Sequence, residues 1–166
     1  MRALRRVLVL LSLAVTTAVA GLPGAPAGAA DEPAWHRIHF PVREKVSFSD
    51  DWGAARAGGR THQGNDLLAP FGTPIHAAQT GRFTRNYNGL GGIGAIVYAD
   101  GGDYTYYAHL EGYSGVPDGA HVAAGTVIGY VGNTGDAQGG PPHLHFEYHP
   151  GGGAAVDPYP YLIALC

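Results

Sequence analysis

Glycine and proline interrupt this chain so often that long helices have almost no room to form. The 166 residues include 27 Gly and 12 Pro, and helix interiors tolerate both residues poorly. Between these interruptions lie short β-prone runs bounded by turn residues, at 82–87, 94–99, 103–109, 127–131 and 143–149. Such runs are typical of all-β domains. The sequence therefore predicts one compact, mostly antiparallel β domain with long loops.

Turn signals connect some of these runs. Asp100-Gly101-Gly102 separates two of them and predicts a hairpin. Residues 70–77 (PFGTPIHA) and 117–124 (PDGAHVAA) share three identical positions in eight. We interpret this weak internal similarity as a repeated β turn.

The N-terminal segment has the pattern of an export signal. Three arginines within residues 2–6 precede fourteen uncharged, mostly apolar residues at 7–20, and cleavage-like triplets follow at 18–20 and 27–29. This pattern predicts a secretory signal peptide over residues 1–30. The alternative is a membrane anchor, but the apolar stretch is shorter than the ~20 residues that a spanning helix needs. We expect an irregular lead-in at 31–46, followed by a single domain at 47–166.

Charge and cysteine content exclude several classes of protein. Residues 31–166 carry seven Lys and Arg and thirteen Asp and Glu, a net charge of −6, and no Lys or Arg follows Arg85. A nucleic-acid-binding protein needs a basic face, and none is visible here. One cysteine, Cys166, cannot form a disulfide framework or a thiolate zinc site. Any bound metal must therefore be held by histidine and carboxylate.

Two other kinds of catalytic or binding motif fail on their context. Residues 89–94 (GLGGIG) match the dinucleotide fingerprint, but a β-prone run follows where a helix should begin. Residues 112–116 (GYSGV) lack the final glycine of a serine-nucleophile elbow. The remaining candidate chemistry is centred on histidine.

The segment 143–149 (HLHFEYH) carries the strongest functional signal. Proline residues bracket it, and polar and apolar residues alternate strictly within it. Because residues two apart in a strand share a face, His143, His145, Glu147 and His149 should line one side. The opposite face should enter the core. A solvated strand that carries histidines by chance is the alternative reading.

Two further segments complete a possible metal site. His62 and Asp66 are four residues apart with Gly64 between them, and His109 ends a second alternating strand. Two histidines plus one carboxylate and an open fourth position are typical of catalytic zinc. We therefore predict His62, Asp66 and His145 as the ligands of one zinc ion. His109 and His143 would then act on the substrate.

Together these segments resemble the lysostaphin-type, LytM-like zinc endopeptidases. The similarity rests on His62-x-Gly-x-Asp66, the Tyr-Tyr-Ala-His109-Leu segment, Gly-Tyr-Val-Gly-Asn-Thr-Gly135 and His143-Leu-His145-Phe-Glu147. The resemblance runs from about residue 40 to residue 161, with the motifs in the order and spacing of the family. The resemblance implies a compact duplicated-hybrid-motif-like barrel or sandwich. It also implies zinc ligands at His62, Asp66 and His145, and catalytic histidines at His109 and His143.

The resemblance further implies what such a protein does. We expect a secreted, single-domain zinc metalloendopeptidase that acts outside the cell or in the cell wall, as a monomer, without stable membrane association. Its substrates would be the cross-bridge or stem peptides of peptidoglycan. The alternative is a non-catalytic zinc-binding regulator of cell-wall amidases with the same fold. Which of His109 and His143 acts as the base stays open.

The remaining polar residues receive simpler interpretations. Glu147 is interpreted as a solvated side chain, with orientation of an imidazole as the alternative. Tyrosines 104, 106, 107 and 130 are read mostly as half-buried strand residues, with a groove wall as the alternative. The five histidines without partner spacing are interpreted as surface or loop residues: His36, His39, His76, His121 and His149.

Overall fold

The computed structural model describes residues 38–166. The predicted signal peptide at 1–30 and the first part of the predicted lead-in therefore lie outside the described residues. From residue 38 to residue 46 the chain contains no helix or strand. Even so, Ile38 and Val42 are buried in the core, and His76 N–H donates to the Pro41 carbonyl at 2.8 Å. This irregular segment is thus packed against the domain.

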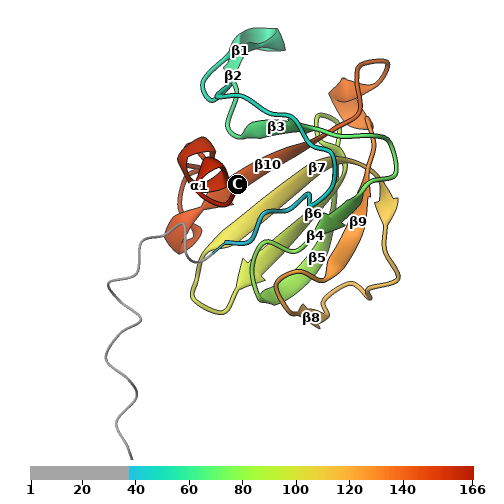
Figure 1. Cartoon of the computed structure of the whole chain (residues 1–166), viewed down its shortest axis with the longest axis vertical. Helices are drawn as coiled ribbons and strands as arrows, with labels where there is room; N and C mark the ends of the chain where they lie inside the picture. Colours follow the sequence, from blue (N-terminus) through green and yellow to red (C-terminus); the bar gives the residue numbers. More distant parts are fainter. Residues whose placement is uncertain (1–37) are drawn as a thin grey trace, which may run out of the picture. The chain divides into compact units, whose positions relative to one another are not determined.

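In the described part of the chain, eight strands form one antiparallel sheet (Figure 1). Six of them follow one another in the order β3 (Asn65–Leu68), β10 (His143–His149), β7 (Tyr104–Tyr113), β6 (Gly92–Ala99), β5 (Gly81–Asn88) and β8 (His121–Val122). The other two are β4 (Pro74–His76) and β9 (Val127–Val131), which pair with each other, while β9 also pairs with β7. The all-β prediction is confirmed.

All five predicted β-prone runs are strands, namely β5, β6, β7, β9 and β10. The predicted hairpin is also present, because β6 and β7 pair antiparallel and Gly102 N–H donates to the Ala99 carbonyl at 3.0 Å. Sequence analysis missed β3, β4 and β8, which are only two to four residues long. Such short strands carry too few residues to show alternation.

A separate two-stranded hairpin lies beside the large sheet. It consists of β1 (Ala55–Arg56) and β2 (Arg60–Thr61), joined by a short 3₁₀ turn, η2 (Ala57–Gly59). Two further 3₁₀ turns, η3 (Gly135–Ala137) and η4 (Pro150–Gly152), flank β10, and α1 (Tyr159–Ile163) follows near the C-terminus. Over residues 38–166, no helix is long and apolar enough to cross a membrane.

The two faces of β10 differ as the alternation predicts: one faces the core, and the other carries the predicted site residues. Leu144, Phe146 and Tyr148 are fully buried on one face. They pack in a core with the other large buried side chains, Tyr107, Phe83, Leu67, Ile75, Leu110, Ile128 and Leu162. The opposite face of β10 carries His143, His145 and Glu147, which are only partly covered. The strand thus anchors its functional side chains on a rigid, buried backbone.

Strand β7 bends at His109 and changes partners there. Before the bend, Tyr104–Ala108 pair with β10, and after it Leu110–Tyr113 pair with β9. His109 has φ +65°, and it is the only non-glycine residue of positive φ among residues 38–166. Its N–H leaves the strand ladder and donates to the Gly91 carbonyl at 2.8 Å. This hydrogen bond places His109 beside the turn between β5 and β6.

The two similar octapeptides of the sequence adopt the same local structure. Thr73 N–H donates to the Pro70 carbonyl at 3.1 Å, and Ala120 N–H donates to the Pro117 carbonyl at 3.2 Å. Gly72 and Gly119 occupy the third position of these turns with φ +81° and +80°, a conformation that favours glycine. Each turn leads into a short strand, β4 or β8. The repeated-turn interpretation is confirmed.

Candidate active site

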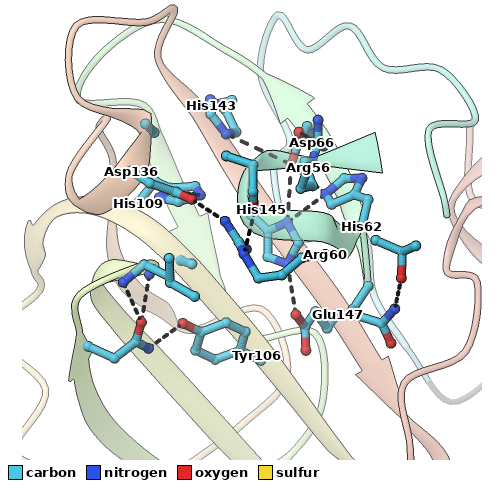
Figure 2. A pocket seen from close by; sticks show the side chains of 18 residues that line it. Arg56, Arg60, His62, Asp66, Tyr106, His109, Asp136, His143, His145 and Glu147 are labelled. Carbon is cyan, nitrogen blue, oxygen red and sulfur yellow. Dashed lines mark hydrogen bonds and ion pairs between the residues drawn. The ribbon is translucent and has the colours of Figure 1, made fainter. Parts of the chain in front are cut away.

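A groove of about 540 Å³ runs over the exposed face of β7 and β10 (Figure 2). The β1–β2 hairpin and the segment leading to β3 form one wall, and η3 with the β5–β6 turn forms the opposite wall. All five predicted site residues line it, together with Arg56, Ala57, Arg60, Thr61, Gln63, Asn88, Leu90, Gly91, Tyr106, Ala108, Asp136, Ala137 and Glu147. Residues 62 and 145, far apart in sequence, therefore meet in one cavity.

Three of these residues bring their donor atoms together at one point. His62 Nε2 lies 2.8 Å from His145 Nδ1 and 3.0 Å from Asp66 Oδ1, and His145 Nδ1 lies 3.1 Å from the same oxygen. The antiparallel pairing of β3 and β10 produces this triangle, because it sets Asp66 directly opposite His145. The three donors thus form a nearly equilateral set in the groove floor.

The outer nitrogens of both imidazoles are held by acceptors. His62 Nδ1 lies 2.9 Å from the Asp51 carbonyl, and His145 Nε2 lies 2.8 Å from Glu147 Oε1. A neutral imidazole has one N–H and one lone pair. Because each outer nitrogen faces an acceptor, it keeps a proton, and the inner nitrogen is the one that would present a lone pair to a bound metal ion. Hydrogen bonding of this kind is what orients metal-binding histidines.

Asp66 is positioned by a similar arrangement. Its Oδ1 belongs to the triangle, while its Oδ2 accepts a hydrogen bond from Arg56 Nη2 at 2.5 Å. Its backbone N–H lies 3.4 Å from Asp51 Oδ1, and Asn65 Nδ2 donates to the same carboxylate oxygen. Burial on its own would raise the pKa of Asp66, but hydrogen bonds from His145 and His62 hold that pKa well below its usual range. The carboxylate is therefore ionised and fixed in direction.

This donor set fits a zinc ion. Zinc takes nitrogen and oxygen ligands at about 2.0–2.2 Å, and tetrahedral geometry then places ligand atoms roughly 3.3 Å apart. The triangle has edges of 2.8 to 3.1 Å, close to that spacing. With two imidazoles and one carboxylate, the fourth tetrahedral position would open toward the groove. His62, Asp66 and His145 are the residues that would hold the ion.

His109 and His143 flank the triangle without joining it. Their rings lie 4.8 Å apart, and His143 Nε2 is 3.8 Å from Asp66 Oδ1. His109 Nδ1 lies 2.8 Å from the Thr134 carbonyl, and His143 Nδ1 lies 2.9 Å from the Pro141 carbonyl. Each Nδ1 therefore donates its proton to backbone, which leaves Nε2 free to accept one. The two predicted catalytic histidines thus lie together beside the predicted ligands (Figure 2).

The proton affinities of the site follow from its contacts. Burial lowers the pKa of His145, but hydrogen bonds to Asp66 and Glu147 outweigh it and raise that pKa to about 9 in the metal-free protein. Burial raises the pKa of Glu147, but hydrogen bonds from His145 and His149 lower it to about 2. Burial also lowers the pKa of His109. His109 is therefore held in its neutral form.

Two of the simpler interpretations are wrong. Glu147 is not solvated, because its two oxygens lie 2.8 Å from His145 Nε2 and 2.8 Å from His149 Nε2. His149 is not a surface residue, because it is 8% exposed, lies in β10 and stacks on Tyr104 with ring centroids 4.0 Å apart. His39 and His121 are exposed, as interpreted, whereas His76 lies in β4 and is half-buried. His36 lies outside the described residues.

Several residues that position the site carried no recognisable sequence signal. The Asp51 carbonyl faces His62 Nδ1, and the Arg56 guanidinium donates to Asp66 Oδ2. Asp136 approaches His109 Nε2 at 3.9 Å. The interpretation of the tyrosines is confirmed in part. Tyr104 and Tyr106 are half-buried strand residues, and Tyr106 also lines the groove. Tyr107 is fully buried and Tyr130 is exposed.

Comparison with known proteins places this geometry in a family. Residues 60–158 match the profile of peptidase family M23. The chain belongs to this family. It is 35% identical over 141 residues to the L-Ala–D-Glu endopeptidase of Bacillus subtilis, an alignment that covers 78% of this chain and 43% of the relative. It is 36% identical over 111 residues to lysostaphin of Staphylococcus simulans, with 63% and 22% covered. This member of family M23 thus spans less than half of the length of these curated relatives.

Solved structures agree with the family M23 assignment. The catalytic domain of lysostaphin from Staphylococcus simulans superposes with a TM-score of 0.61 at 30% identity, covering 71% of this chain and 92% of that domain. A LytM protein from Ruminococcus gnavus superposes with a TM-score of 0.67 at 30% identity, covering 77% and 60%. The resemblance to lysostaphin-type peptidases is confirmed.

Proposed function

We propose that this M23 peptidase is a zinc-dependent endopeptidase that hydrolyses peptide bonds in peptidoglycan. The observation that carries the proposal is the convergence of three donor atoms on the groove floor, flanked by two imidazoles whose Nδ1 atoms contact backbone carbonyls. Relatives support the substrate class, because their names specify an L-Ala–D-Glu endopeptidase, lysostaphin and a peptidoglycan DD-endopeptidase. We further propose that the chain is exported and acts in the cell wall as a monomer.

Bound zinc would supply a Lewis acid for the scissile carbonyl and a water whose pKa is lowered to about 7. The protein side chains would position the reaction and transfer protons. His62, Asp66 and His145 fix the position of the reaction on the groove floor. The open mouth of the groove admits an extended peptide over β7 and β10, so the scissile bond can reach that point.

His109 and His143 would carry out proton transfer. Each Nε2 faces the groove and is free to accept a proton, while the Nδ1–H bond to a backbone carbonyl fixes the ring and the tautomer. After it accepts a proton, either imidazole can donate it to the leaving amine or to the developing oxyanion. The lowered pKa of His109 suits it to the role of the neutral base. Glu147 is directed at His145 and takes no part in proton transfer to the substrate.

The non-catalytic alternative is a zinc-binding regulator of cell-wall amidases. Such a protein needs the fold and a partner surface, but it does not need two imidazoles beside the metal with Nε2 atoms free. The presence of both His109 and His143, each anchored through Nδ1, favours the enzyme.

One experiment separates the two functions. The purified chain is assayed for bound zinc and for release of soluble peptides from peptidoglycan, as wild type and as His143→Ala. We expect the wild type to bind one zinc per chain and to cleave, and the variant to retain zinc with cleavage reduced at least 100-fold, the size of a general acid–base contribution.

A matched control uses an exposed histidine outside the groove. His121→Ala removes a ring that pairs only with Asp100 on the surface, and it should leave zinc binding and cleavage unchanged. A zinc-loaded wild type that cleaves none of several peptidoglycan types would overturn the endopeptidase proposal and favour the regulator.

A further inference from the structure

One side chain crosses the groove above the site. Arg60 extends from β2 on one wall, and its Nη2 donates to Asp136 Oδ2 on η3, on the opposite wall, at 3.0 Å. Its Nε donates to the Ala57 carbonyl at 3.1 Å, which holds the side chain toward the groove. Figure 2 shows the guanidinium between Asp136 and the front of His145. Arg60 and Asp136 therefore form a bridge over the groove floor.

The other permanently charged side chains that line the groove are bonded to residues of the predicted site or to His149. Arg56 is bonded to Asp66, and Glu147 is bonded to His145 and His149. The bridge across the groove differs, because the side chains of Arg60 and Asp136 are 41% and 44% exposed. Exposed ion pairs contribute little net stability. A ligand can thus replace either member at small cost.

The distribution of charged residues indicates whether a ligand replaces Arg60 or Asp136 in this ion pair. Residues 31–166 carry a net charge of −6, and no Lys or Arg follows Arg85. Yet the β1–β2 hairpin places two arginines at the groove, and a guanidinium is well suited to bind carboxylates. The carboxylate of Asp136 occupies the position where Arg60 would meet a carboxylate of a peptide. Asp136 Oδ1 also lies 3.9 Å from His109 Nε2. A ligand carboxylate that replaces Asp136 would therefore lie beside the predicted catalytic histidine.

We propose that Arg60 selects peptides with a free carboxylate next to the scissile bond, and that Asp136 occupies Arg60 until such a peptide binds. This inference rests on the proposed endopeptidase function and narrows its substrate. An acidic peptide, such as one containing a glutamyl residue with a free α-carboxylate, is then preferred over a neutral one. A bridge of glycine residues offers Arg60 no carboxylate.

The opposite assignment makes opposite predictions. If Asp136 bound an ammonium group of the substrate, removal of Asp136 would weaken binding and removal of Arg60 would strengthen it. In our proposal Arg60→Gln weakens binding of the acidic peptide, and Asp136→Asn strengthens it by freeing the guanidinium. The sign of each effect therefore identifies the residue that recognises the ligand.

The test compares two probes that differ by one charge. One is N-acetyl-L-alanyl-D-glutamic acid with its γ-carboxyl joined to methylamine, which keeps a free α-carboxylate, and the other is its α-carboxamide. Binding is measured on the zinc-loaded full chain carrying His143→Ala, which prevents turnover, and cleavage is measured without that substitution. Arg82→Gln is the matched control, because Arg82 is an exposed arginine of β5 that does not line the groove.

We expect Arg60→Gln to weaken binding of the acidic probe about tenfold, the effect of one charge-assisted hydrogen bond, and to leave the amide probe and bound zinc unchanged. Asp136→Asn should tighten the acidic probe alone, and Arg82→Gln should change neither probe. Equal binding of both probes by wild type and Arg60→Gln would overturn the inference while leaving the endopeptidase function intact. Arg60-dependent binding, with no cleavage of the probe or of any of several peptidoglycan types, would support the inference and refute the endopeptidase function.

Discussion

Each of the four histidines at the site is fixed through the nitrogen that faces away from the groove. His62, His109 and His143 are held by backbone carbonyls, and His145 is held by a carboxylate. This common arrangement determines the tautomer of each ring. In each ring, the nitrogen that faces the groove is therefore the one that can bind a metal ion or accept a proton. The contact between His145 and Glu147 is the one among them that a side-chain substitution can remove.

Glu147→Ala should therefore weaken zinc binding by about 10- to 100-fold, the range for loss of a carboxylate that orients a metal-binding histidine. The imidazole of His145 would lose the acceptor at 2.8 Å from Nε2, and its Nδ1 would no longer be held toward His62 and Asp66. Competition with a zinc chelator measures the change. Glu111→Ala in the same sheet is the control, since Glu111 is exposed. Equal zinc affinity of the two variants would contradict the orienting role.

The pKa of His145 makes zinc binding depend on pH. Hydrogen bonds to Asp66 and Glu147 overcome burial and raise that pKa to about 9, so the metal-free protein carries a proton on this ring at pH 7. Zinc needs the Nδ1 lone pair, and its binding must displace that proton. Apparent affinity should rise about tenfold per pH unit up to roughly pH 9. Calorimetric titration in two buffers of different ionisation enthalpy should show about one proton released per zinc. Release of none would refute this assignment.

Sequence reasoning named five residues that the structure brings together in the groove, but it missed the residues that position them. Strand alternation predicted that His143 and His145 share a face, and the structure places both in the groove. Asp51 and Arg56 could not be predicted, because their contacts to His62 and Asp66 depend on how the β1–β2 hairpin folds over β3. Glu147 was misread because its position on the face was visible, but its two histidine partners were not.

At the scale of elements, Gly64 allows the segment before β3 to approach β10 closely. A Cβ at this position would lie 2.5 Å from the Phe146 carbonyl oxygen and 2.7 Å from His145 Cε1. Glycine is therefore required between His62 and Asp66 by lack of space. The close approach at Gly64 is therefore what allows His62 and Asp66, only four residues apart, to lie against β10 together.

Gly64→Ala should displace β3 from β10 and separate the three donor atoms. We expect zinc affinity to fall more than tenfold and stability to decrease by about 1–3 kcal/mol, as for other overpacked sites. Chelator competition and urea unfolding measure these effects. Gly89→Ala is the matched control, because nothing lies within 4 Å of a Cβ there and its φ is not positive. If the two variants behave alike, close approach is not the reason for glycine at 64.

The bend in β7 has a cost that a stability measurement can detect. His109 adopts φ +65°, which costs a non-glycine residue roughly 1–2 kcal/mol. His109→Gly should therefore be about 1 kcal/mol more stable than His109→Ala, although both should lose activity. Urea midpoints at saturating zinc compare the pair. At Ala108, where φ is negative, Ala→Gly should be destabilising. A more stable alanine variant at 109 would contradict this account of the bend.

Elements were predicted from the sequence only where they were long enough to show a pattern. Strands β5, β6, β7, β9 and β10 each contain at least five residues, and their alternation or composition was visible. The strand β3 contains only four residues, and it forms because β10 offers it a partner. The change of partners within β7 could not be predicted, since it depends on the single unusual φ of His109.

At the scale of the whole molecule, the acidic character of the chain limits how it can recognise the proposed substrate. Residues 31–166 carry a net charge of −6, which repels anionic wall polymers. At 0.1 M salt this repulsion extends only about 10 Å from the protein surface. Binding must then come from short-range contacts inside the groove. The protein should consequently find its substrate without electrostatic attraction to the wall.

Sedimentation with purified cell walls tests this expectation. The bound fraction should be small at low salt and should not fall as salt rises to about 0.5 M, because no long-range attraction is present to be screened. A charge-reversed variant provides the contrast: Glu44→Lys, Asp50→Lys and Glu111→Lys together alter three exposed acids and bring residues 31–166 to neutrality. That variant should bind more at low salt and lose the gain at high salt. Tight wild-type binding that salt abolishes would instead reveal a basic attachment surface, and recognition would no longer be confined to the groove.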